Sequence, residues 1–265
     1  MMENQNIQYV FLDSGIGGIP YLKYLRQTEP NASCAYIADI EHFPYGEKKL
    51  DEVIRFSRRI VEKIICKFNP KVIIIACNTI SVSSLACLRK EFDVPFVGTV
   101  PAIKPAASLS KNKKIALLAT ERTINDIYTQ NLIEEFGAGC KFFMRADPRL
   151  IIRIEEDLPN ASRSDKIKAV ETAIEFFRST GADTAVLGCT HFLHLQDIFK
   201  TECFPDIRIV DSLDGVVKQA LNISPLDKSY KSNTTCGFYV TLNNPAVQKK
   251  YLAYTSFFNM QLKFL

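Results

Sequence analysis

The chain has 265 residues, of which 47% are hydrophobic and 23% are charged, and its formal net charge is +4. This composition is ordinary for a globular protein with a sizeable core, and so small a charge gives no reason to expect a nucleic-acid partner. No apolar run approaches the roughly 18 residues that a membrane-spanning helix requires, and the first ten residues do not resemble a secretory leader. We therefore expect a cytoplasmic protein with no membrane partner, whose eight cysteines stay reduced and are mostly buried.

Short apolar segments along the chain predict the strands of a sheet. They are nearly continuous rather than alternating, which is typical of strands buried on both faces of a parallel sheet. In chain order, the predicted strands cover residues 7–13, 33–39, 71–77, 95–100, 113–120, 184–189 and 207–211.

Amphipathic segments separate these strands. Residues 53–68 place Ile60, Val61 and Ile64 on one helical face and charges on the opposite face, and residues 166–179 behave similarly. Strands that alternate with helices indicate an α/β fold. The last stretch, residues 241–265, is aromatic and partly apolar, and we expect a terminal helix there.

A weak internal repeat predicts two related parallel-sheet α/β lobes. Asp13 precedes Cys77 by 64 residues, and Thr120 precedes Cys189 by 69, with a strand, a polar turn and a helix at similar offsets. A proline-interrupted segment, residues 99–114, resembles a crossover between the lobes. We expect residues 1–100 and 208–265 to form the first lobe, with Cys77, and residues 101–207 to form the second lobe, with Cys189.

Polar residues follow several of the predicted strands, at the end where parallel α/β sheets bind ligands. These residues include Asp13 and Ser14, then Cys77 with Asn78 and Thr79, and finally Cys189 with Thr190 and His191. Such side chains also cap helices, but capping does not require cysteine. Two cysteines in equivalent positions therefore point to thiol chemistry.

The glycine-rich segment DSGIGG, residues 13–18, bears on whether a nucleotide cofactor binds. Pro20 occupies the position of the third glycine in the dinucleotide-binding pattern, and no Gly-Lys-Ser/Thr phosphate loop is present. We expect instead a tight turn whose backbone N–H groups bind a small anion, and no cofactor.

Three chemistries are compatible with these cysteines. Cys189 and His191 could form a nucleophilic dyad, and Cys77, Cys189 and His191 could bind zinc, although no metal-type spacing supports a metal. In the third, the two thiols act as acid and base on opposite faces of a substrate carbon, which inverts a stereocentre. The helix that follows each cysteine favours its thiolate, and Asp13 and His191 could assist the two thiols. We favour this third interpretation.

Six segments in this order and spacing resemble those of bacterial glutamate racemases: FLDSGIGG, PYGEK, ACNT, VPAIKPA, LLAT and GCTH. The resemblance extends from Tyr9 to Leu221. It implies two pseudo-symmetric α/β lobes with the active site in the cleft between them. It also implies a cofactor-independent enzyme that interconverts L- and D-glutamate, supplies D-glutamate for peptidoglycan, and forms a homodimer.

By the same resemblance, Cys77 and Cys189 are the catalytic thiols, assisted by Asp13 and His191. The substrate contacts that it implies are Asp13, Ser14, Tyr45, Gly46, Asn78, Thr79, Thr190 and His191. Glu155 lies where this family often has an acidic residue behind the histidine, and a solvated helix charge is an equal interpretation.

Two alternatives remain open from the sequence. One is a racemase for another amino acid, such as aspartate. The other is a non-catalytic amino-acid-binding protein with the same fold.

Overall fold

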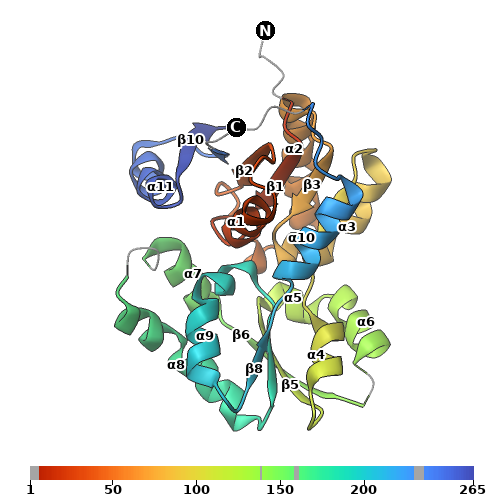
Figure 1. The fold of residues 1–265 in the computed structure, drawn as a ribbon, viewed down its shortest axis with the longest axis vertical. Helices are drawn as coiled ribbons and strands as arrows, with labels where there is room; N and C mark the ends of the chain where they lie inside the picture. The colour runs from red at the N-terminus through yellow and green to blue at the C-terminus, as the bar shows by residue number, and fades with distance from the viewer. Residues whose placement is uncertain (1–5, 138, 158–160, 230–235) are drawn as a thin grey trace. The chain divides into compact units, whose positions relative to one another are not determined.

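The computed structural model describes residues 6–137, 139–157, 161–229 and 236–265. Our expectation that the N-terminal stretch is not a secretory leader therefore falls partly outside the described residues. The chain divides into two compact units. Unit 1 comprises Met1–Thr99 and Leu213–Leu265, and unit 2 comprises Val100–Ser212. Each unit has its own parallel sheet with helices on both faces (Figure 1).

The sheet of unit 1 has the order β10-β9-β2-β1-β3-β4, with every neighbouring pair parallel. Its strands are β1 (Tyr9–Asp13), β2 (Cys34–Ala38), β3 (Val72–Ile75), β4 (Phe96–Gly98), β9 (Cys236–Val240) and β10 (Met260–Phe264). Strands β1, β2 and β3 are buried at every residue, which is why their sequences are continuous apolar runs.

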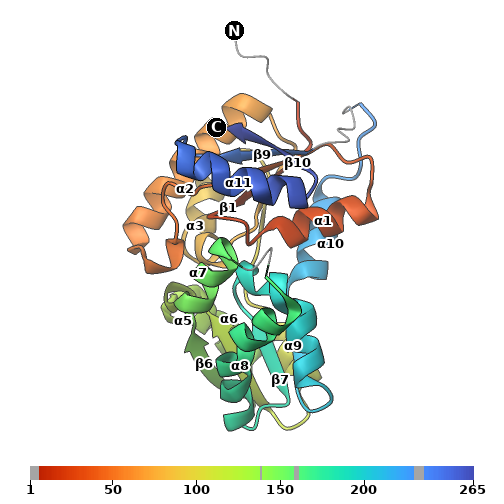
Figure 2. The same cartoon turned by 90° about the vertical axis from the view of Figure 1, so that its left-hand side faces the viewer.

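The helices of unit 1 cover both faces of its sheet. They are α1 (Ile19–Thr28), α2 (Leu50–Phe68), α3 (Asn78–Glu91), α10 (Leu213–Ile223) and α11 (Pro245–Phe257), with the short 3-10 helix η1 (Tyr45–Glu47). Helix α1 packs against α10 on one side of the strands, and α2 packs against α3 on the other (Figure 2). Helix α2 buries Val53, Ile60 and Ile64 on its apolar stripe and ends at Asn69, whose φ of 42° is left-handed.

The sheet of unit 2 has the order β6-β5-β7-β8 and is also fully parallel. Its strands are β5 (Lys114–Ala119), β6 (Lys141–Ala146), β7 (Thr184–Leu187) and β8 (Arg208–Val210). Its helices are α4 (Ile103–Leu109), α5 (Glu121–Asn125), α6 (Ile127–Phe136), α7 (Pro148–Glu156), α8 (Arg163–Ser179) and α9 (Gln196–Cys203), with the 3-10 helix η3 (Thr190–Leu195). Among the described helices of both units, none is long and apolar enough to span a bilayer.

The two sheets confirm the repeat that the sequence predicted. The order β2-β1-β3-β4 in unit 1 corresponds strand for strand to β6-β5-β7-β8 in unit 2. Cys77 follows β3 and Cys189 follows β7, so the two cysteines occupy equivalent positions in equivalent strands. The α/β class and the duplication of a parallel-sheet unit are therefore as expected.

Three expectations need correction. Residues 208–210 form β8 and pair with β7, so the chain returns to unit 1 at Leu213 rather than at residue 208. The last stretch is not only a helix, because β10 follows α11 and extends the sheet of unit 1. Cys66 and Cys87 are exposed on their helices, and so depart from the burial that we expected for most of the cysteines.

Candidate active site

Polar side chains gather at the carboxyl ends of the strands in each unit, and we call these two groups the candidate half-sites, or half-sites for short. The first half-site lies where β2, β1 and β3, three neighbouring strands, end. It contains Asp13 at the end of β1 and Ser14 after it, Asp39 after β2, Tyr45 and Gly46 at η1, and Cys77, Asn78 and Thr79 after β3. Parallel register brings these strand ends together, since Asp13 pairs with Ala38 and Leu12 pairs with Ile75.

Asp13 is fully buried at the end of β1. Its Oδ1 accepts hydrogen bonds from the backbone N–H of Ser14 and from Ser14 Oγ, the latter at 3.1 Å. Gly18 allows the chain to pass close by, because a Cβ added there would lie 2.5 Å from Ala76 Cβ and 3.0 Å from Asp13 Oδ2. Gly18 thus lies close both to the Asp13 carboxylate and to Ala76, the residue that precedes Cys77.

Cys77 lies at the N-cap of α3, with extended backbone angles, and is 5% exposed. Asn78 and Thr79 form the first turn of α3 and are each 2% exposed. Among the described residues, Asn78 Nδ2 has no hydrogen-bond partner. A buried amide donor without a partner is costly, so this group suggests a ligand oxygen that completes it.

Tyr45 anchors the segment that begins at η1. Its ring is 1% exposed, and its hydroxyl donates a hydrogen bond to Asp39, which is fully buried. Burial raises the pKa of Tyr45 well above its ordinary value, and the negative charges of Asp39, Cys77 and Asp13 raise it further. Tyr45 therefore stays protonated.

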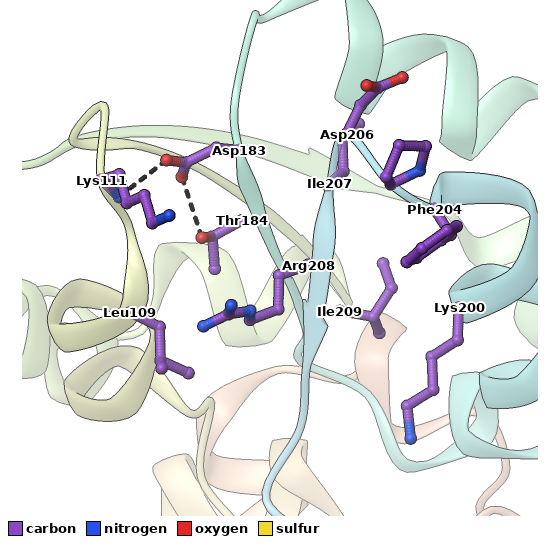
Figure 3. A pocket seen from close by; sticks show the side chains of 11 residues that line it. Leu109, Lys111, Asp183, Thr184, Lys200, Phe204, Asp206, Ile207, Arg208 and Ile209 are labelled. Carbon is purple, nitrogen blue, oxygen red and sulfur yellow. Dashed lines mark hydrogen bonds between the residues drawn. The ribbon is translucent and has the colours of Figure 1, made fainter.

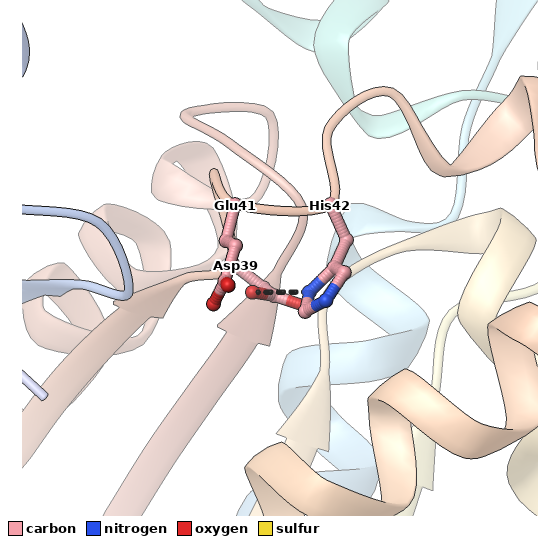
Figure 4. A group of neighbouring side chains, drawn as sticks. All are labelled: Asp39, Glu41 and His42. Atoms are coloured by element: carbon pink, nitrogen blue, oxygen red, sulfur yellow. Dashed lines mark hydrogen bonds and ion pairs between the residues drawn. The ribbon is translucent and has the colours of Figure 1, made fainter.

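Asp39, Glu41 and His42 bring three possible metal ligands within 4.8 Å of one another (Figure 4). However, His42 Nδ1 lies 3.0 Å and 2.8 Å from the two oxygens of Asp39, which is the geometry of an N–H donor rather than of a ligand lone pair. The same carboxylate also accepts from Tyr45 and Thr241. A hydrogen-bond network, not a metal, accounts for this cluster.

The second half-site lies in unit 2, where β5 and β7 end side by side. Cys189 is 5% exposed and precedes η3, in which Thr190 and His191 are buried. The Sγ of Cys189 lies 3.9 Å from His191 Nδ1, and His191 Nε2 lies 2.9 Å from Glu155 Oε2. Helix α7 carries Glu155, which is fully buried, so the solvated-charge interpretation of this residue is wrong.

The charge state of His191 follows from these two contacts. Burial by itself lowers the pKa of His191, but hydrogen bonds to Cys189 and Glu155, together with their negative charges, raise it well above its ordinary value. The imidazole is therefore protonated at neutral pH, with one N–H toward the sulfur and one toward the carboxylate. Because both ring nitrogens already have partners, the zinc interpretation of Cys77, Cys189 and His191 is disfavoured.

The buried cysteines outside the half-sites have a different character. Burial raises the pKa of Cys203 to about 11 and that of Cys236 to about 12. Burial also raises the pKa of Cys34, which lies beside Cys236 on the neighbouring strand. These thiols stay protonated and behave as small apolar side chains.

A cavity of about 440 Å³ lies elsewhere in unit 2 (Figure 3). It is lined by Thr184 and Arg208, the first residues of β7 and β8, so it lies at the opposite end of the sheet from Cys189. Two of its lining residues are charged: Arg208 begins the short edge strand β8, and Lys200 lies on α9. Charged side chains of this kind protect the exposed edges of natural sheets from pairing with other chains. This cavity is not part of either half-site.

All the residues expected from the sequence fall into the two half-sites. Asp13, Ser14, Tyr45, Gly46, Cys77, Asn78 and Thr79 belong to unit 1, and Cys189, Thr190 and His191 belong to unit 2. From the sequence we assigned no role to Asp39, although it lies at the end of a predicted buried strand. Nothing local identified Thr241, which reaches Asp39 from 202 positions along the chain.

Comparisons with known proteins identify the family of the chain. Residues 22–220 match the family model described as Asp/Glu/hydantoin racemase. A glutamate racemase of Treponema pallidum (strain Nichols) is 41% identical over 258 residues, which cover 97% of this chain and 96% of the relative. The glutamate racemase of Actinobacillus pleuropneumoniae serotype 3 (strain JL03) is 39% identical over 208 residues, or 78% of each chain.

A solved structure extends the comparison to the whole fold. Escherichia coli glutamate racemase, in complex with L-glutamate and the activator UDP-MurNAc-Ala, superposes with a TM-score of 0.85 and 30% identity over 98% of both chains. Matches of this extent, in sequence and in fold, mean that the chain belongs to the Asp/Glu/hydantoin racemase family of isomerases, among its glutamate racemases.

Proposed function

We propose that the protein interconverts L- and D-glutamate without a cofactor, by proton transfer through Cys77 and Cys189 on opposite faces of the α-carbon. One thiolate removes the α-proton, and the other residue, as a thiol, delivers a proton to the opposite face. Electrons remain on the substrate carbon between the two steps, so no oxidant or reductant is needed. The proposal requires both half-sites to act on one bound glutamate.

The observation that carries this proposal is the duplication of the thiol. In each unit, a cysteine that is 5% exposed follows one of two equivalent strands, β3 or β7. A helix and buried polar groups come directly after each cysteine. An amino-acid-binding protein would need neither sulfur. The relatives named glutamate racemase support glutamate as the substrate.

Removal of the weakly acidic α-proton requires electrostatic stabilisation of the carbanion. Hydrogen-bond donors that are already in place stabilise charge as it develops, without reorganisation cost. Ser14, Asn78, Thr79 and Thr190 are short donors of the appropriate kind, and the partnerless Nδ2 of Asn78 is the most suitable for a substrate carboxylate. We assign Asp13 to assist Cys77 and protonated His191 to assist Cys189.

Deuterium exchange tests the proposal directly. In D₂O without added cofactor, either enantiomer of glutamate should gain deuterium at the α-carbon as it racemises. Cys77→Ala and Cys189→Ala should each abolish racemisation. Cys236→Ala in unit 1 and Cys203→Ala in unit 2 are matched controls, since both thiols are buried and protonated, and both variants should racemise glutamate. Racemisation by Cys77→Ala at the parent rate would show that the mechanism is wrong.

The alternative substrate class is a shorter acidic amino acid. Turnover of D-aspartate that exceeds turnover of D-glutamate would reassign the enzyme to aspartate. Glutamate should also protect Cys77 and Cys189 from alkylation, and a lack of protection would argue against any glutamate-binding role.

We further propose that the enzyme works in the cytoplasm as a homodimer and supplies D-glutamate for peptidoglycan. Among the described residues no disulfide links any of the eight cysteines, which fits a reducing compartment. Light scattering on the purified protein would test the dimer, since a monomeric mass at micromolar concentration would contradict it.

A further inference from the structure

The buried carboxylate of Asp39 gathers side chains from three parts of unit 1. It accepts hydrogen bonds from His42 Nδ1 at 2.8 Å, from Thr241 Oγ1 at 2.8 Å, and from the hydroxyl of Tyr45. We call Asp39, His42, Tyr45 and Thr241 the Asp39 clamp. A buried carboxylate is stable only when its oxygens are well satisfied, and this carboxylate has three side-chain donors.

Thr241 contributes to the clamp twice. Its hydroxyl donates to Asp39 Oδ1 and also accepts a hydrogen bond from the backbone N–H of Glu41 at 3.1 Å. Its own N–H donates to the carbonyl of Ala38 at 3.3 Å, which continues the β2–β9 pairing. One hydroxyl at the end of β9 therefore fixes both the side chain of Asp39 and the turn that follows it.

His42 fixes the other side of the carboxylate. Its ring stacks on Phe56 of α2, with centroids 3.7 Å apart and planes 22° from parallel. Tyr45 meets the same Phe56 edge-on, at 6.5 Å and 85°. The segment from Asp39 to Tyr45 thus contacts both α2 and the end of β9. The imidazole of His42 points to the carboxylate of Asp39 (Figure 4), and the phenol of Tyr45 donates to the same carboxylate.

The clamp reaches the proposed substrate contacts through Tyr45. Because the hydroxyl of Tyr45 donates to Asp39, its proton is not available to a substrate, and the ring serves as an anchor. Tyr45 begins η1 and is followed directly by Gly46, whose position is therefore set by where that ring is anchored.

We propose that Thr241 and His42 are positioning residues of the glutamate site: they fix Asp39, and through it the Tyr45–Gly46 segment. This inference rests on the proposed function. It gives the C-terminal segment a part in substrate binding, although that segment contributes neither thiol. Loss of one clamp donor should loosen the segment and weaken glutamate binding, while both thiols remain in place.

The test compares substitutions that remove or keep a donor. Thr241→Val removes the hydroxyl at nearly constant volume, and we expect the KM for both enantiomers to rise about fivefold or more while kcat changes less than about twofold. Thr241→Ser keeps the hydroxyl and should restore the parent KM. His42→Phe keeps a ring on Phe56 but has no donor for Asp39, so it should raise KM as Thr241→Val does. His42→Asn keeps a donor near the position of Nδ1 and should restore KM toward the parent value.

Thr255→Val is the matched control, since Thr255 is 2% exposed in the same C-terminal segment and its hydroxyl donates to a helix carbonyl, that of Leu252. A purely structural role for Thr241 would lower the melting temperature without separating KM from kcat, and would leave Thr241→Val similar to Thr255→Val. Adding Asp39→Asn should make the Thr241→Val effect on KM disappear, because both substitutions break the same clamp.

The outcomes separate this inference from the proposed function. If the parent enzyme racemises glutamate and Thr241→Val has the same KM and kcat as Thr255→Val, only the positioning role is overturned. A parent that neither exchanges the α-hydrogen nor is protected by glutamate from alkylation at Cys77 overturns both. If glutamate protects Cys77 in the parent, the glutamate concentration for half-protection should rise in Thr241→Val by the same factor as KM.

Discussion

The pairing of His191 with Glu155 makes a testable prediction about stability and pH. Both side chains are buried, and the two partners are 2.9 Å apart. Removing one partner of a buried ion pair costs about 3–5 kcal/mol, but Glu155→Gln retains an oxygen that can accept from Nε2–H. We therefore expect a loss of about 1.5–3 kcal/mol, the value of a hydrogen bond to a charged group, and a melting temperature lower by roughly 3–12 °C.

The sign of the pH dependence follows from the pKa of His191, which is raised well above its ordinary value. A group whose native pKa exceeds its unfolded pKa stabilises the fold fully below the unfolded value, here about 6.5. That stabilisation is lost as the pH rises through the raised native pKa. The difference in melting temperature between parent and Glu155→Gln should therefore be largest near pH 6 and should shrink in alkaline buffer.

Thermal melts of both proteins at several pH values between about 5.5 and 9.5 measure this difference. Glu134→Gln is the control, because Glu134 is exposed on α6 in the same unit, and its effect should be small at every pH. A melting-temperature difference for Glu155→Gln that stays constant across the range would refute the assignment of a protonated His191. Racemisation should also slow in both directions equally, since the equilibrium constant between enantiomers is one.

Two further substitutions examine the first half-site. Gly18→Ala would place a Cβ 2.5 Å from Ala76 Cβ and 3.0 Å from Asp13 Oδ2, so we expect about 1–3 kcal/mol of destabilisation and reduced kcat/KM. Gly215→Ala, where a Cβ meets nothing within 4 Å, should be neutral or stabilising, and parent-like melts for both would contradict the packing argument. Asn78→Ala should raise the KM for glutamate about tenfold with little change in melting temperature, because its Nδ2 makes no hydrogen bond to any residue that the structure describes. An unchanged KM would remove Asn78 from the binding site.

Much of the fold could be predicted from apolar runs alone. All seven predicted strands exist, because strands buried on both faces must be continuously hydrophobic. Strands β6, β9 and β10 were missed, although in β10 Met260, Leu262 and Phe264 alternate with Gln261 and Lys263, as in a half-buried strand. The sheet to which β8 belongs could not be predicted, since pairing depends on tertiary contacts rather than on local sequence.

The site shows the same division between local and distant information. The positions of Cys77 and Cys189 after equivalent strands were predictable, because a cysteine that follows a buried strand is a local feature. Glu155 was also accessible to a closer analysis: it follows Ile151 and Ile154 at the spacing of one buried helical stripe, whereas the adjacent Glu156 is exposed. The bond from Thr241 to Asp39 was not accessible, because no periodicity links residues 202 positions apart.

The two half-sites differ in the contacts made by the aspartate that follows equivalent strands. Strands β2 and β6 are equivalent, and each is followed by an aspartate, Asp39 and Asp147. In unit 2, β6 is an edge strand, and Asp147 caps α7 by accepting from the N–H of Leu150, which lets that helix carry Glu155 to His191. In unit 1, β9 pairs with β2, so the equivalent carboxylate meets Thr241 instead. The segment after it consequently forms no long helix but turns back to place Tyr45. The added strands β9 and β10 thus break the symmetry of the repeat beside the first half-site. For this reason a clamp substitution should change contacts made by unit 1 and leave the Cys189–His191–Glu155 arrangement intact.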